Sequence, residues 1–405
     1  MEIPDRTELI ELLRSLPAAA PLLDRLRDVA GVHVVGGAVR DLLLGGRPTD
    51  LDLVVEGDAA AAAARLGGER RVHDRFGTST VTVNGRTYDI ARARTESYSR
   101  PGALPDVAPA SLVEDLRRRD FTVNAMAVAL GGATPGELSA APRAFEDLES
   151  RQLRVLHDRS FVDDPTRLLR LVRYASRLGF EIEPHTRALA GEAVRGGALQ
   201  TVTGPRIGTE LRLLAREPDP VGALGALHAL DLDGAIYPGF GLDEGDRSLA
   251  RRALELLPDD ARAERLALAV AARGLPREQL SALLDRLGFE AGDRDAIVAA
   301  ATGADQLAGA LAEATRPSEI ARLADGVGAE LVALAGALGP AEEARDWLTS
   351  LRHVGLEIDG TDLKDAGIPE GPAIGRGLRA ALAAKLDGRA SGPQQELAEA
   401  LRAAR

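Results

Sequence analysis

The stretch 33–55 reads HVVGGAVRDLLLGGRPTDLDLVV, and its first half predicts a turn suited to an anion. The β-branched run 33–35 predicts a strand that ends at the double glycine, Gly36 and Gly37. A short helix is expected over residues 38–44. Glycine lets the backbone come close to an anion, and the amides at the start of a helix point toward it. This part of the chain therefore predicts a phosphate-binding turn.

The second half of the stretch predicts a strand over residues 50–55 that carries two acids. Because strand side chains alternate between two faces, Asp50 and Asp52 should share one face. Leu51 and Leu53 should then face the core. Mg²⁺ prefers carboxylate oxygens and keeps room in its coordination shell for phosphate. The sequence thus places a candidate metal site beside the candidate phosphate site.

The composition of the chain excludes several classes of protein. Its 405 residues are 45% hydrophobic and 28% charged, which allows two or more domains with sizeable cores. The net charge of −12 gives no general attraction to nucleic acid, so an RNA site requires a local patch of arginines. The absence of cysteine excludes disulfides and zinc–thiolate sites and fits a cytoplasmic protein. The start of the chain is acidic, unlike a signal peptide, and charges interrupt every apolar run before it reaches membrane-spanning length.

The N-terminal third mixes helix and strand patterns. Residues 5–30 carry an amphipathic helical pattern that is broken by a proline. Strands are expected over 78–83 and 88–93, joined by an Asn-Gly turn. Residues 96–113, which are rich in proline, are expected to form a loop. After Leu153 the strand patterns all but vanish and helical periods run to the C-terminus, which predicts an α+β part followed by an all-helical remainder.

A second group of charged residues, 114–126, reads EDLRRRDFTVNAM. Arginines beside an ionised aspartate are pre-oriented, and their planar forks suit phosphate or ribose oxygens. The alternative is an exposed, charged start of a helix with local ion pairs. The residues by themselves leave both interpretations open.

A third group, 163–174, reads DDPTRLLRLVRY. The proline suits the first turn of a helix, with Asp164 as its N-cap. Arg167, Arg170 and Arg173 recur every three residues and should lie along one face. One interpretation is a basic, solvated face. The other is that Asp164 and Arg167 offer an acceptor and a fork to a base edge, while the two later arginines bind phosphate.

Asp89 lies within the short apolar strand expected over 88–93. A lone acid there is either an exposed residue at a sheet edge or a third metal carboxylate beside Asp50 and Asp52. Both interpretations stay open on the sequence.

Two other classes of phosphate-handling site are disfavoured. The histidines show no metal-binding spacing, and the pairs His73-Asp74 and His157-Asp158 stand far apart, unlike an HD-type phosphohydrolase. No Gly-Lys-Ser/Thr follows the double glycine, so the turn is not a P-loop.

In this order and spacing the three groups resemble the class II tRNA nucleotidyltransferase and bacterial poly(A) polymerase family, within the DNA polymerase beta-like superfamily. The matching pieces are GGAVRD at 36–41 with the two aspartates, RRDFTVNAM at 118–126, and DDPTRLLRLVR at 163–173. Residues 205–211 are more weakly similar to the family's neck helix. Residues 358–375 are weakly similar to the body-tail region of many CCA-adding members.

The resemblance implies a polymerase beta-like nucleotidyltransferase head, built of a small mixed sheet with helices, followed by an all-α neck, body and tail. The expected domains are an N-terminal helical extension at 1–30, the head at 31–155, the neck with a base-reading motif at 156–240, and a tRNA-binding body and tail at 241–405.

The implied activity is template-independent addition of C and/or A nucleotides from CTP and ATP to the 3′ end of tRNA. Mg²⁺ is the implied cofactor and pyrophosphate the leaving group; no membrane and no protein partner are implied. A poly(A) polymerase of the same family would share the head residues, although the body-tail resemblance favours the tRNA enzyme. A catalytically silent RNA-binding protein is disfavoured by the intact acids and arginines.

The resemblance also implies roles for single residues. Asp50 and Asp52 would hold Mg²⁺, and Asp89 is the candidate for a third catalytic carboxylate. Nucleotide binding is implied for Gly36, Gly37, Arg40, Arg119, Asp120, Asn124, Asp164, Arg167, Arg170 and Arg173. Among these, Gly37 and Arg40 would contact the triphosphate. Asp164 and Arg167 would read the base, with Arg170 and Arg173 completing the pocket.

Two departures from the family pattern bear on specificity. The base-reading motif usually begins Glu-Asp, whereas this chain has Asp163-Asp164. Relatives usually carry an Asp-Pro-x-Gly-Gly-like hinge, whereas residues 139–148 read SAAPRAFEDL. That hinge is thought to let the head shift between CTP and ATP. An enzyme that adds only CC or only A is therefore an alternative.

Overall fold

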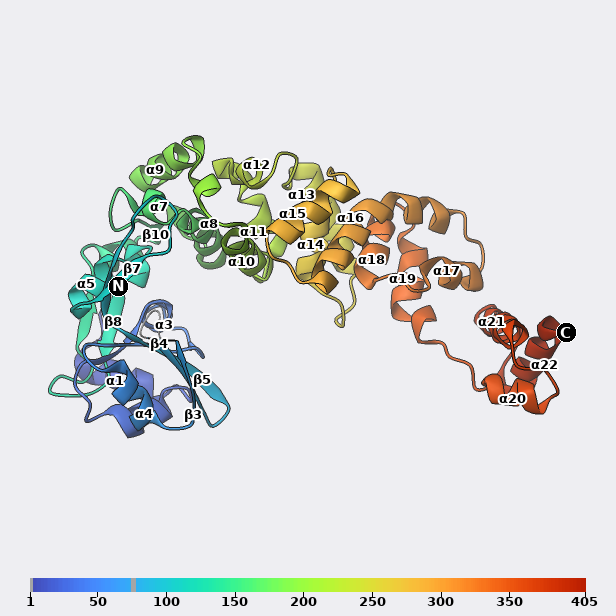
Figure 1. Ribbon diagram of the computed structural model, residues 1–405, viewed down its shortest axis with the longest axis horizontal. Coiled ribbons are helices and arrows are strands. Elements are labelled where there is room, and N and C mark those ends of the chain that lie inside the picture. Colours follow the sequence, from blue (N-terminus) through green and yellow to red (C-terminus); the bar gives the residue numbers. More distant parts are fainter. Residues whose placement is uncertain (1–2, 74–77) are drawn as a thin grey trace. The chain divides into compact units, whose positions relative to one another are not determined.

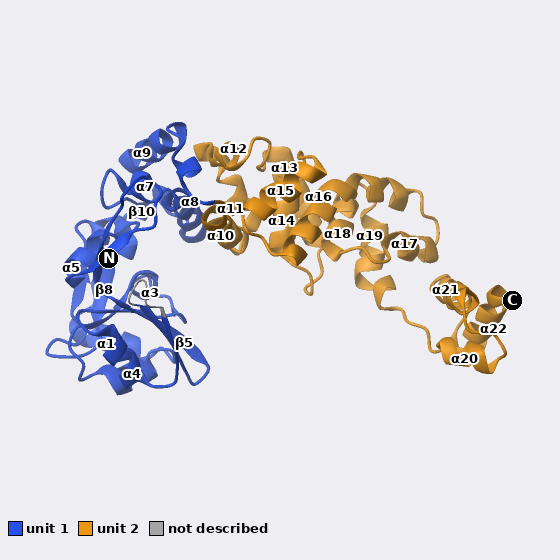
Figure 2. Cartoon of the chain, in the orientation of Figure 1, with its two compact units in different colours: residues 1–203 blue, residues 204–405 orange. Residues whose placement is uncertain are grey.

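The computed structural model describes residues 3–73 and 78–405 (Figure 1). The chain divides into two compact units, Met1–Thr203 and Gly204–Arg405 (Figure 2). The first unit contains a mixed β-sheet with helices, and the second is helical. The predicted fold class, α+β followed by an all-helical remainder, is confirmed. The domain boundaries expected from the sequence stay a prediction.

The first unit is built on a seven-stranded mixed sheet. In spatial order its strands are β3 (Glu69–His73), β4 (Thr78–Val83), β5 (Arg86–Arg92), β2 (Asp52–Val55), β1 (Val32–Val35), β8 (Met126–Ala129) and β9 (Leu138–Ala140). The pair β2 and β5 is parallel, and the other neighbours are antiparallel. Strands β1 and β8 are buried along their whole length, as expected for strands at the centre of a covered sheet.

The predicted Asn-Gly hairpin turn is confirmed between β4 and β5. Asn84 and Gly85 have φ angles of 51° and 74°, the left-handed conformation that a two-residue hairpin turn requires. The register that follows pairs Thr80 with Asp89, which fixes where Asp89 lies on the sheet.

The strand that carries the acids is shorter than predicted. It begins at Asp52, and Asp50 lies just before it, so the predicted range 50–55 is wrong at its start. The alternation nevertheless holds, since Leu51 and Leu53 are each 1% exposed while both aspartates are exposed. Asp50 therefore shares the face of Asp52 without belonging to the sheet ladder.

The loop expected over 96–113 is also wrong in part. Strands β6 (Arg94–Ser97) and β7 (Asp106–Pro109) pair there as an antiparallel two-stranded sheet, and α5 (Leu112–Arg117) follows. The prolines that suggested a loop lie in the connection and at the end of β7, where a missing N–H costs little. The two strands are short and their connection, residues 98–105, is longer than a tight hairpin turn, so the turn pattern that marks a hairpin is absent.

Helices cover the sheet and extend the first unit. They are α1 (Arg6–Arg14), α2 (Ala20–Leu26), α3 (Gly37–Leu43), α4 (Ala59–Leu66), α5, α6 (Ala144–Glu149), α7 (Ser160–Asp163), α8 (Thr166–Leu178) and α9 (Pro184–Arg195). One hydrophobic cluster joins α5 to the sheet, because Leu112 and Leu116 pack with Val35 and Val54. The short strands β10 (Gln152–Leu153) and β11 (Glu181–Ile182) pair in parallel.

The second unit contains the remaining helices. They are α10 (Gly204–Ala215), α11 (Pro220–Gly225), α12 (Leu232–Ile236), α13 (Glu244–Leu256), α14 (Ala263–Ala271), α15 (Arg277–Arg286), α16 (Ala291–Ala312), α17 (Pro317–Ala324), α18 (Ala329–Ala337), α19 (Ala341–Thr349), α20 (Gly360–Asp365), α21 (Pro372–Leu386) and α22 (Gly392–Ala404). The last three share their own core around Leu363, Ala381 and Ala400. Within the described ranges, no helix is both long enough and apolar enough to cross a bilayer.

The segment that replaces the family's glycine hinge has a strained backbone. Arg143, the residue before α6, has φ 68° and ψ 1°, a left-handed conformation that side chains disfavour. The helix behind it is firmly held, because the buried carboxylate of Asp147 accepts from the Thr122 hydroxyl at 2.8 Å and from Nε of Arg154 at 3.0 Å. Packing of α6 therefore holds Arg143 in this conformation.

Replacing Arg143 with glycine should stabilise the protein. Glycine adopts a positive φ at little cost, so we expect Arg143→Gly to raise the free energy of unfolding by about 0.5–1 kcal/mol. Urea denaturation would measure it, with Arg143→Ala as the matched control that removes the same side chain but keeps the strain. A less stable glycine variant would show that the backbone at this position is unstrained.

Candidate active site

A polar cavity of about 320 Å³ lies within the first unit. Its walls come from the turn before α3, from β2 and β6, from the end of α5 and the residues after it, and from the start of α8. The lining residues are Gly36, Gly37, Asp52, Glu96, Arg118, Arg119, Asp120, Asn124, Asp164, Thr166, Arg167, Arg170 and Tyr174. All three groups singled out in the sequence therefore meet at one cavity.

Most of the predicted site residues line this cavity. They are Gly36, Gly37, Asp52, Arg119, Asp120, Asn124, Asp164, Arg167 and Arg170. The roles assigned to them stay predictions. Four more predicted residues lie outside the lining, namely Asp50, Asp89, Arg40 and Arg173.

The double glycine brings an arginine against the backbone. Gly36 has φ 75°, and a Cβ at this position would lie 3.0 Å from Nη1 of Arg119. Glycine is therefore needed at position 36 both for the backbone conformation and for the close approach of Arg119. The predicted turn and the arginine run thus form one wall of the cavity.

The arginine run pairs with buried acids and also faces the cavity. Asp115 is completely buried and binds Arg118 at 2.6 Å and Arg119 at 3.0 Å. Burial lowers the pKa of Arg119, and the charge of Asp115 opposes this effect. The two interpretations left open by the sequence, local ion pairs and a ligand-facing group, are therefore compatible.

Asp120 connects this run to α8. Its Oδ2 accepts from Nε and Nη2 of Arg170 at 2.9 and 2.5 Å, and its Oδ1 accepts from Nδ2 of Asn124 at 3.1 Å. Burial raises the pKa of Asp120, but the charge and hydrogen bonds of Arg170 outweigh it and lower the pKa to about 2. The carboxylate is therefore ionised at neutral pH.

Arg40 lies behind the cavity wall, which differs from the placement expected for a triphosphate contact. Its side chain is 2% exposed, and it donates to Asp41 at 2.8 Å and to the side-chain oxygen of Asn124. Its guanidinium also lies 5.4 Å from the ring centroid of Tyr174. The resemblance implied a triphosphate contact for Arg40. Its guanidinium does lie beside the glycine turn, since a Cβ on Gly37 would be 3.4 Å from Nη2, but the side chain is buried.

Tyr174 gathers further arginines around its ring. Arg173 and Arg170 lie 4.8 and 5.7 Å from the ring centroid, and Phe121 meets the ring edge-on at 5.9 Å. Arg173 is only 7% exposed, so it supports the wall from within. Cation–π contacts of this kind are each worth about 1 kcal/mol or more when desolvated.

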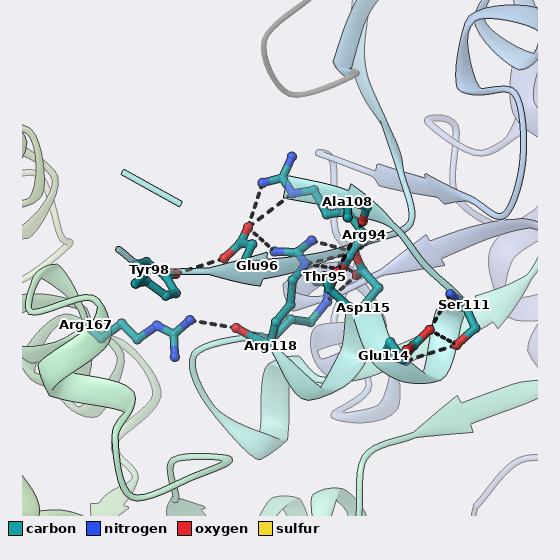
Figure 3. Close-up of polar contacts among 11 residues, drawn as sticks. Arg94, Thr95, Glu96, Tyr98, Ala108, Ser111, Glu114, Asp115, Arg118 and Arg167 are labelled. Carbon is teal, nitrogen blue, oxygen red and sulfur yellow. Dashed lines mark hydrogen bonds and ion pairs between the residues drawn. The ribbon is translucent and has the colours of Figure 1, made fainter. Parts of the chain in front are cut away.

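The base-reading pair predicted in the third group faces the cavity. Helix α8 begins at Thr166 with Pro165 as its N-cap, so the predicted N-cap at Asp164 is wrong by one residue. Asp164 still contacts the first turn, because its Oδ1 accepts from the Thr166 amide at 3.2 Å and hydroxyl at 2.6 Å. Arg167 is 5% exposed and donates to the Arg118 carbonyl at 2.6 Å (Figure 3). The alternative of a basic, solvated face is therefore wrong for Arg167 and Arg173.

The acids lie close enough to affect one another. Although Asp52 is partly open to solvent, desolvation by the surrounding protein atoms raises its pKa; Asp89 raises this pKa further, Arg119 lowers it, and Asp50 has a smaller raising effect. Asp89 belongs to β5, which is an interior strand, so the alternative of a sheet-edge residue is wrong. Its carboxylate accepts from the Thr80 hydroxyl at 2.6 Å.

A cation would relieve this accumulation of negative charge. Carboxylate oxygens are the donors that Mg²⁺ prefers, so Asp50 and Asp52 suit the implied metal. Among residues 3–73 and 78–405, no group of three or more acidic or histidine side chains is already arranged to hold a metal ion. The pair His73-Asp74 lies partly outside those ranges.

Four lining residues were not predicted, namely Glu96, Arg118, Thr166 and Tyr174. Glu96 binds Arg118 at 2.8 Å and accepts from the Tyr98 hydroxyl at 3.0 Å (Figure 3). Burial and the Glu96 carboxylate raise the pKa of Tyr98. Three of the four stand inside the quoted groups and could have been found, but Glu96 lies in the segment interpreted as a loop.

Sequence comparisons agree with this arrangement. Residues 32–154 match the family model described as the poly A polymerase head domain. The A-adding tRNA nucleotidyltransferase of Geobacter sulfurreducens is 34% identical over 98% of this chain, which spans 49% of that protein. The CC-adding tRNA nucleotidyltransferase of Deinococcus radiodurans is 38% identical, covering 80% of this chain and 84% of that protein. The chain thus spans about half the length of some curated relatives.

Solved structures cover the whole chain. A CCA-adding enzyme in its apo form II is 30% identical with a TM-score of 0.83, covering 99% of this chain and all of that one. The Thermotoga maritima CCA-adding enzyme complexed with tRNA is 29% identical with a TM-score of 0.77, covering both chains fully.

The match over residues 32–154 and the mixed sheet followed by helices define the head and helical region of a class of nucleotidyltransferases. The extent of the matches narrows this class to one family. The chain belongs to the class II tRNA nucleotidyltransferases.

The ion pair of Asp120 should make stability depend on acidity. The pKa of Asp120 is lowered in the folded state, so its contribution is present above the unfolded pKa and is lost as pH falls through the folded pKa of about 2. We expect the stability gap between wild type and Asp120→Asn to shrink by about 2 kcal/mol from about pH 5 to pH 2. Urea denaturation across this range would measure it. A gap that stays constant with pH would contradict the lowered pKa.

Proposed function

We propose that the chain adds C and/or A nucleotides from CTP and ATP to the 3′ end of tRNA without a nucleic-acid template. The observation that carries this proposal is the single cavity shared by the glycine turn, Asp52 and the pair Asp164 and Arg167. Structures of a CCA-adding enzyme with ATP and with CTP, each 30% identical to this chain, support it. The T. maritima structure with tRNA supports the RNA substrate.

In the proposed reaction, the 3′-hydroxyl oxygen of the RNA attacks the α-phosphorus of the nucleotide. The bond from the α-phosphorus to the bridging oxygen breaks, and pyrophosphate leaves with that electron pair. Arg119 and Arg170 lie on the cavity wall and would hold the triphosphate, with forks already oriented by Asp115 and Asp120.

The metal assignment is part of the same proposal. Asp50 and Asp52 would hold Mg²⁺, with Asp89 as a third carboxylate. When bound, Mg²⁺ lowers the pKa of an attacking hydroxyl and stabilises the charge on a departing phosphate. The raised pKa of Asp52 beside Asp89 supports this assignment, since a cation would offset the repulsion.

Base selection would fall to Asp164 and Arg167. They offer an acceptor and donors from the same cavity wall, where a mismatched base would leave buried polar groups unpaired. The helical remainder, 241–405, would hold the tRNA by phosphate contacts and shape rather than by sequence. Binding should therefore weaken with added salt despite the acidic total charge.

A narrower activity, addition of the terminal A alone, is favoured by one observation. Two A-adding tRNA nucleotidyltransferases, from Halalkalibacterium halodurans and Aquifex aeolicus, are 43% and 42% identical over about half of this chain. Over nearly the whole chain, the A-adding enzyme of Geobacter sulfurreducens is 34% identical and a CCA-adding enzyme from Limosilactobacillus fermentum is 28% identical. The CC-adding enzyme of Deinococcus radiodurans is 38% identical over 80% of the chain, so addition of CC alone is the other narrower activity. The exchange of the glycine hinge for residues 139–148 is consistent with a fixed nucleotide choice.

One assay separates these activities. Transcripts of one tRNA ending at the discriminator base, at C or at CC are offered CTP, ATP or both, and product lengths are read on a gel. Extension of all three to CCA would support the complete activity, whereas extension of the CC-ended tRNA alone would identify an A-adding enzyme. Long A-tails would indicate a poly(A) polymerase, and no product with any transcript would contradict the proposal.

Removing a metal carboxylate should abolish incorporation. We expect Asp50→Ala and Asp52→Asn each to lower the rate of nucleotide addition by at least about 10³-fold. Each variant removes a carboxylate that would hold the Mg²⁺ ion, and this ion would stabilise the charge on the departing phosphate. Filter binding of tRNA should stay unchanged. Asp28→Asn, an exposed acid in the same unit, is the matched control and should keep the wild-type rate. Wild-type rates in either active-site variant would disprove the metal assignment.

A further inference from the structure

We propose that Ser160 is a positioning residue for nucleotide selection, because it holds both members of the base-reading pair. This inference rests on the proposed function and adds a residue that does not itself line the cavity. Ser160 is the first residue of α7, and its side chain is completely buried.

The Ser160 hydroxyl fixes the guanidinium of Arg167. Its Oγ accepts from Nη1 of Arg167 at 2.7 Å, while the carbonyl of Arg118 accepts from Nη2 at 2.6 Å. With one acceptor at each terminal nitrogen, the planar fork has a single favoured orientation. Arg167 therefore presents its remaining donors to the cavity in one direction.

The backbone of Ser160 holds the other member of the pair. The amide of Asp164 donates to the Ser160 carbonyl at 3.2 Å, which closes the single turn of α7 just before the cap of α8. The neighbouring Phe161 is 1% exposed and anchors this turn in the core. One buried residue thus sets the positions of Asp164 and Arg167 relative to each other.

The acid that precedes Asp164 does not take this role. Asp163 pairs instead with Arg159 at 3.0 Å, and the Arg159 side chain is 70% exposed. Both acceptors on the terminal nitrogens of Arg167 are neutral, a hydroxyl and a carbonyl, whereas a carboxylate there would offset its charge. The arrangement fixes Arg167 and leaves its charge available to the oxygen or nitrogen acceptors of a base edge.

The test compares variants that differ only in the hydroxyl. Ser160→Ala and Ser160→Gly remove Oγ, Ser160→Thr keeps it, and Ser79→Ala is the matched control, a serine 3% exposed on β4. For each variant, kcat and KM for ATP and CTP are measured with a tRNA substrate, and UTP and GTP are offered as incorrect nucleotides. Titration calorimetry with Mg²⁺ and without tRNA gives Kd for ATP and CTP.

Loss of a hydrogen bond to a buried charged group should act mainly on binding. We expect Ser160→Ala and Ser160→Gly to raise KM and Kd for the accepted nucleotide about tenfold and to reduce discrimination against UTP and GTP similarly. The kcat and the melting temperature should change little, and Ser160→Thr should restore KM toward the wild-type value.

Two results would overturn the inference. One is a wild-type KM, Kd and discrimination in both Ser160→Ala and Ser160→Gly. The other is an equal loss for all nucleotides that follows the melting temperature and is matched by Ser79→Ala, which would mark a purely structural role. If the wild-type protein adds no nucleotide to any tRNA, the proposed function is contradicted instead. The Kd values of the Ser160 variants and the wild type for ATP and CTP would still test the role of Ser160.

Discussion

The cavity depends on one buried ion pair, between Asp120 after α5 and Arg170 on α8. It joins the part of the chain that carries the glycine turn and the acids to the helix that carries Arg167, one of the proposed base-reading pair. Removing two charges from water is costly, and the pair offsets that cost only because Asn124 and the fork geometry satisfy the carboxylate as well. The same Asn124 accepts from Arg40, so the connection continues into α3. Breaking the pair would leave an uncompensated charge in the wall of the site.

Two proposed roles, metal binding and base selection, fall to different parts of that cavity. The acids lie on β2 and just before it, on a sheet whose hydrophobic alternation fixes their face. Of the proposed base-reading pair, Arg167 lies on α8, and Asp164 lies just before this helix, where its carboxylate accepts from the Thr166 hydroxyl. Asp52 and Arg167 are therefore held on a strand and a helix, whereas Asp50 and Asp164 lie just before these elements. The acidic total charge of −12 does not oppose nucleotide binding here, because the arginines concentrate locally around the site.

Sequence patterns predicted the features that depend on local chemistry. The glycine turn, the alternation around Asp52 and the Asn84-Gly85 hairpin follow from backbone rules that act over a few residues. The hairpin of β6 and β7, and with it Glu96, was missed because its strands are short and its connection over 98–105 lacks the pattern of a tight hairpin turn. The burial of Arg40 was missed because its partner Asn124 and the ring of Tyr174 are brought to it only by tertiary packing.

The arginines of the cavity fall into two sets according to their partners. Arg118, Arg119 and Arg170 are each paired with a carboxylate, so part of their charge is already offset and their positions are fixed. The terminal nitrogens of Arg167 are held by neutral oxygens, so its charge gains most from an acceptor supplied by a ligand. Under the proposed function, a base edge that offers such an acceptor would bind favourably, whereas one that presents a donor would leave the buried guanidinium of Arg167 without an acceptor. Strong discrimination then requires few contacts, because the penalty for the wrong base arises from burial that the fold has already imposed.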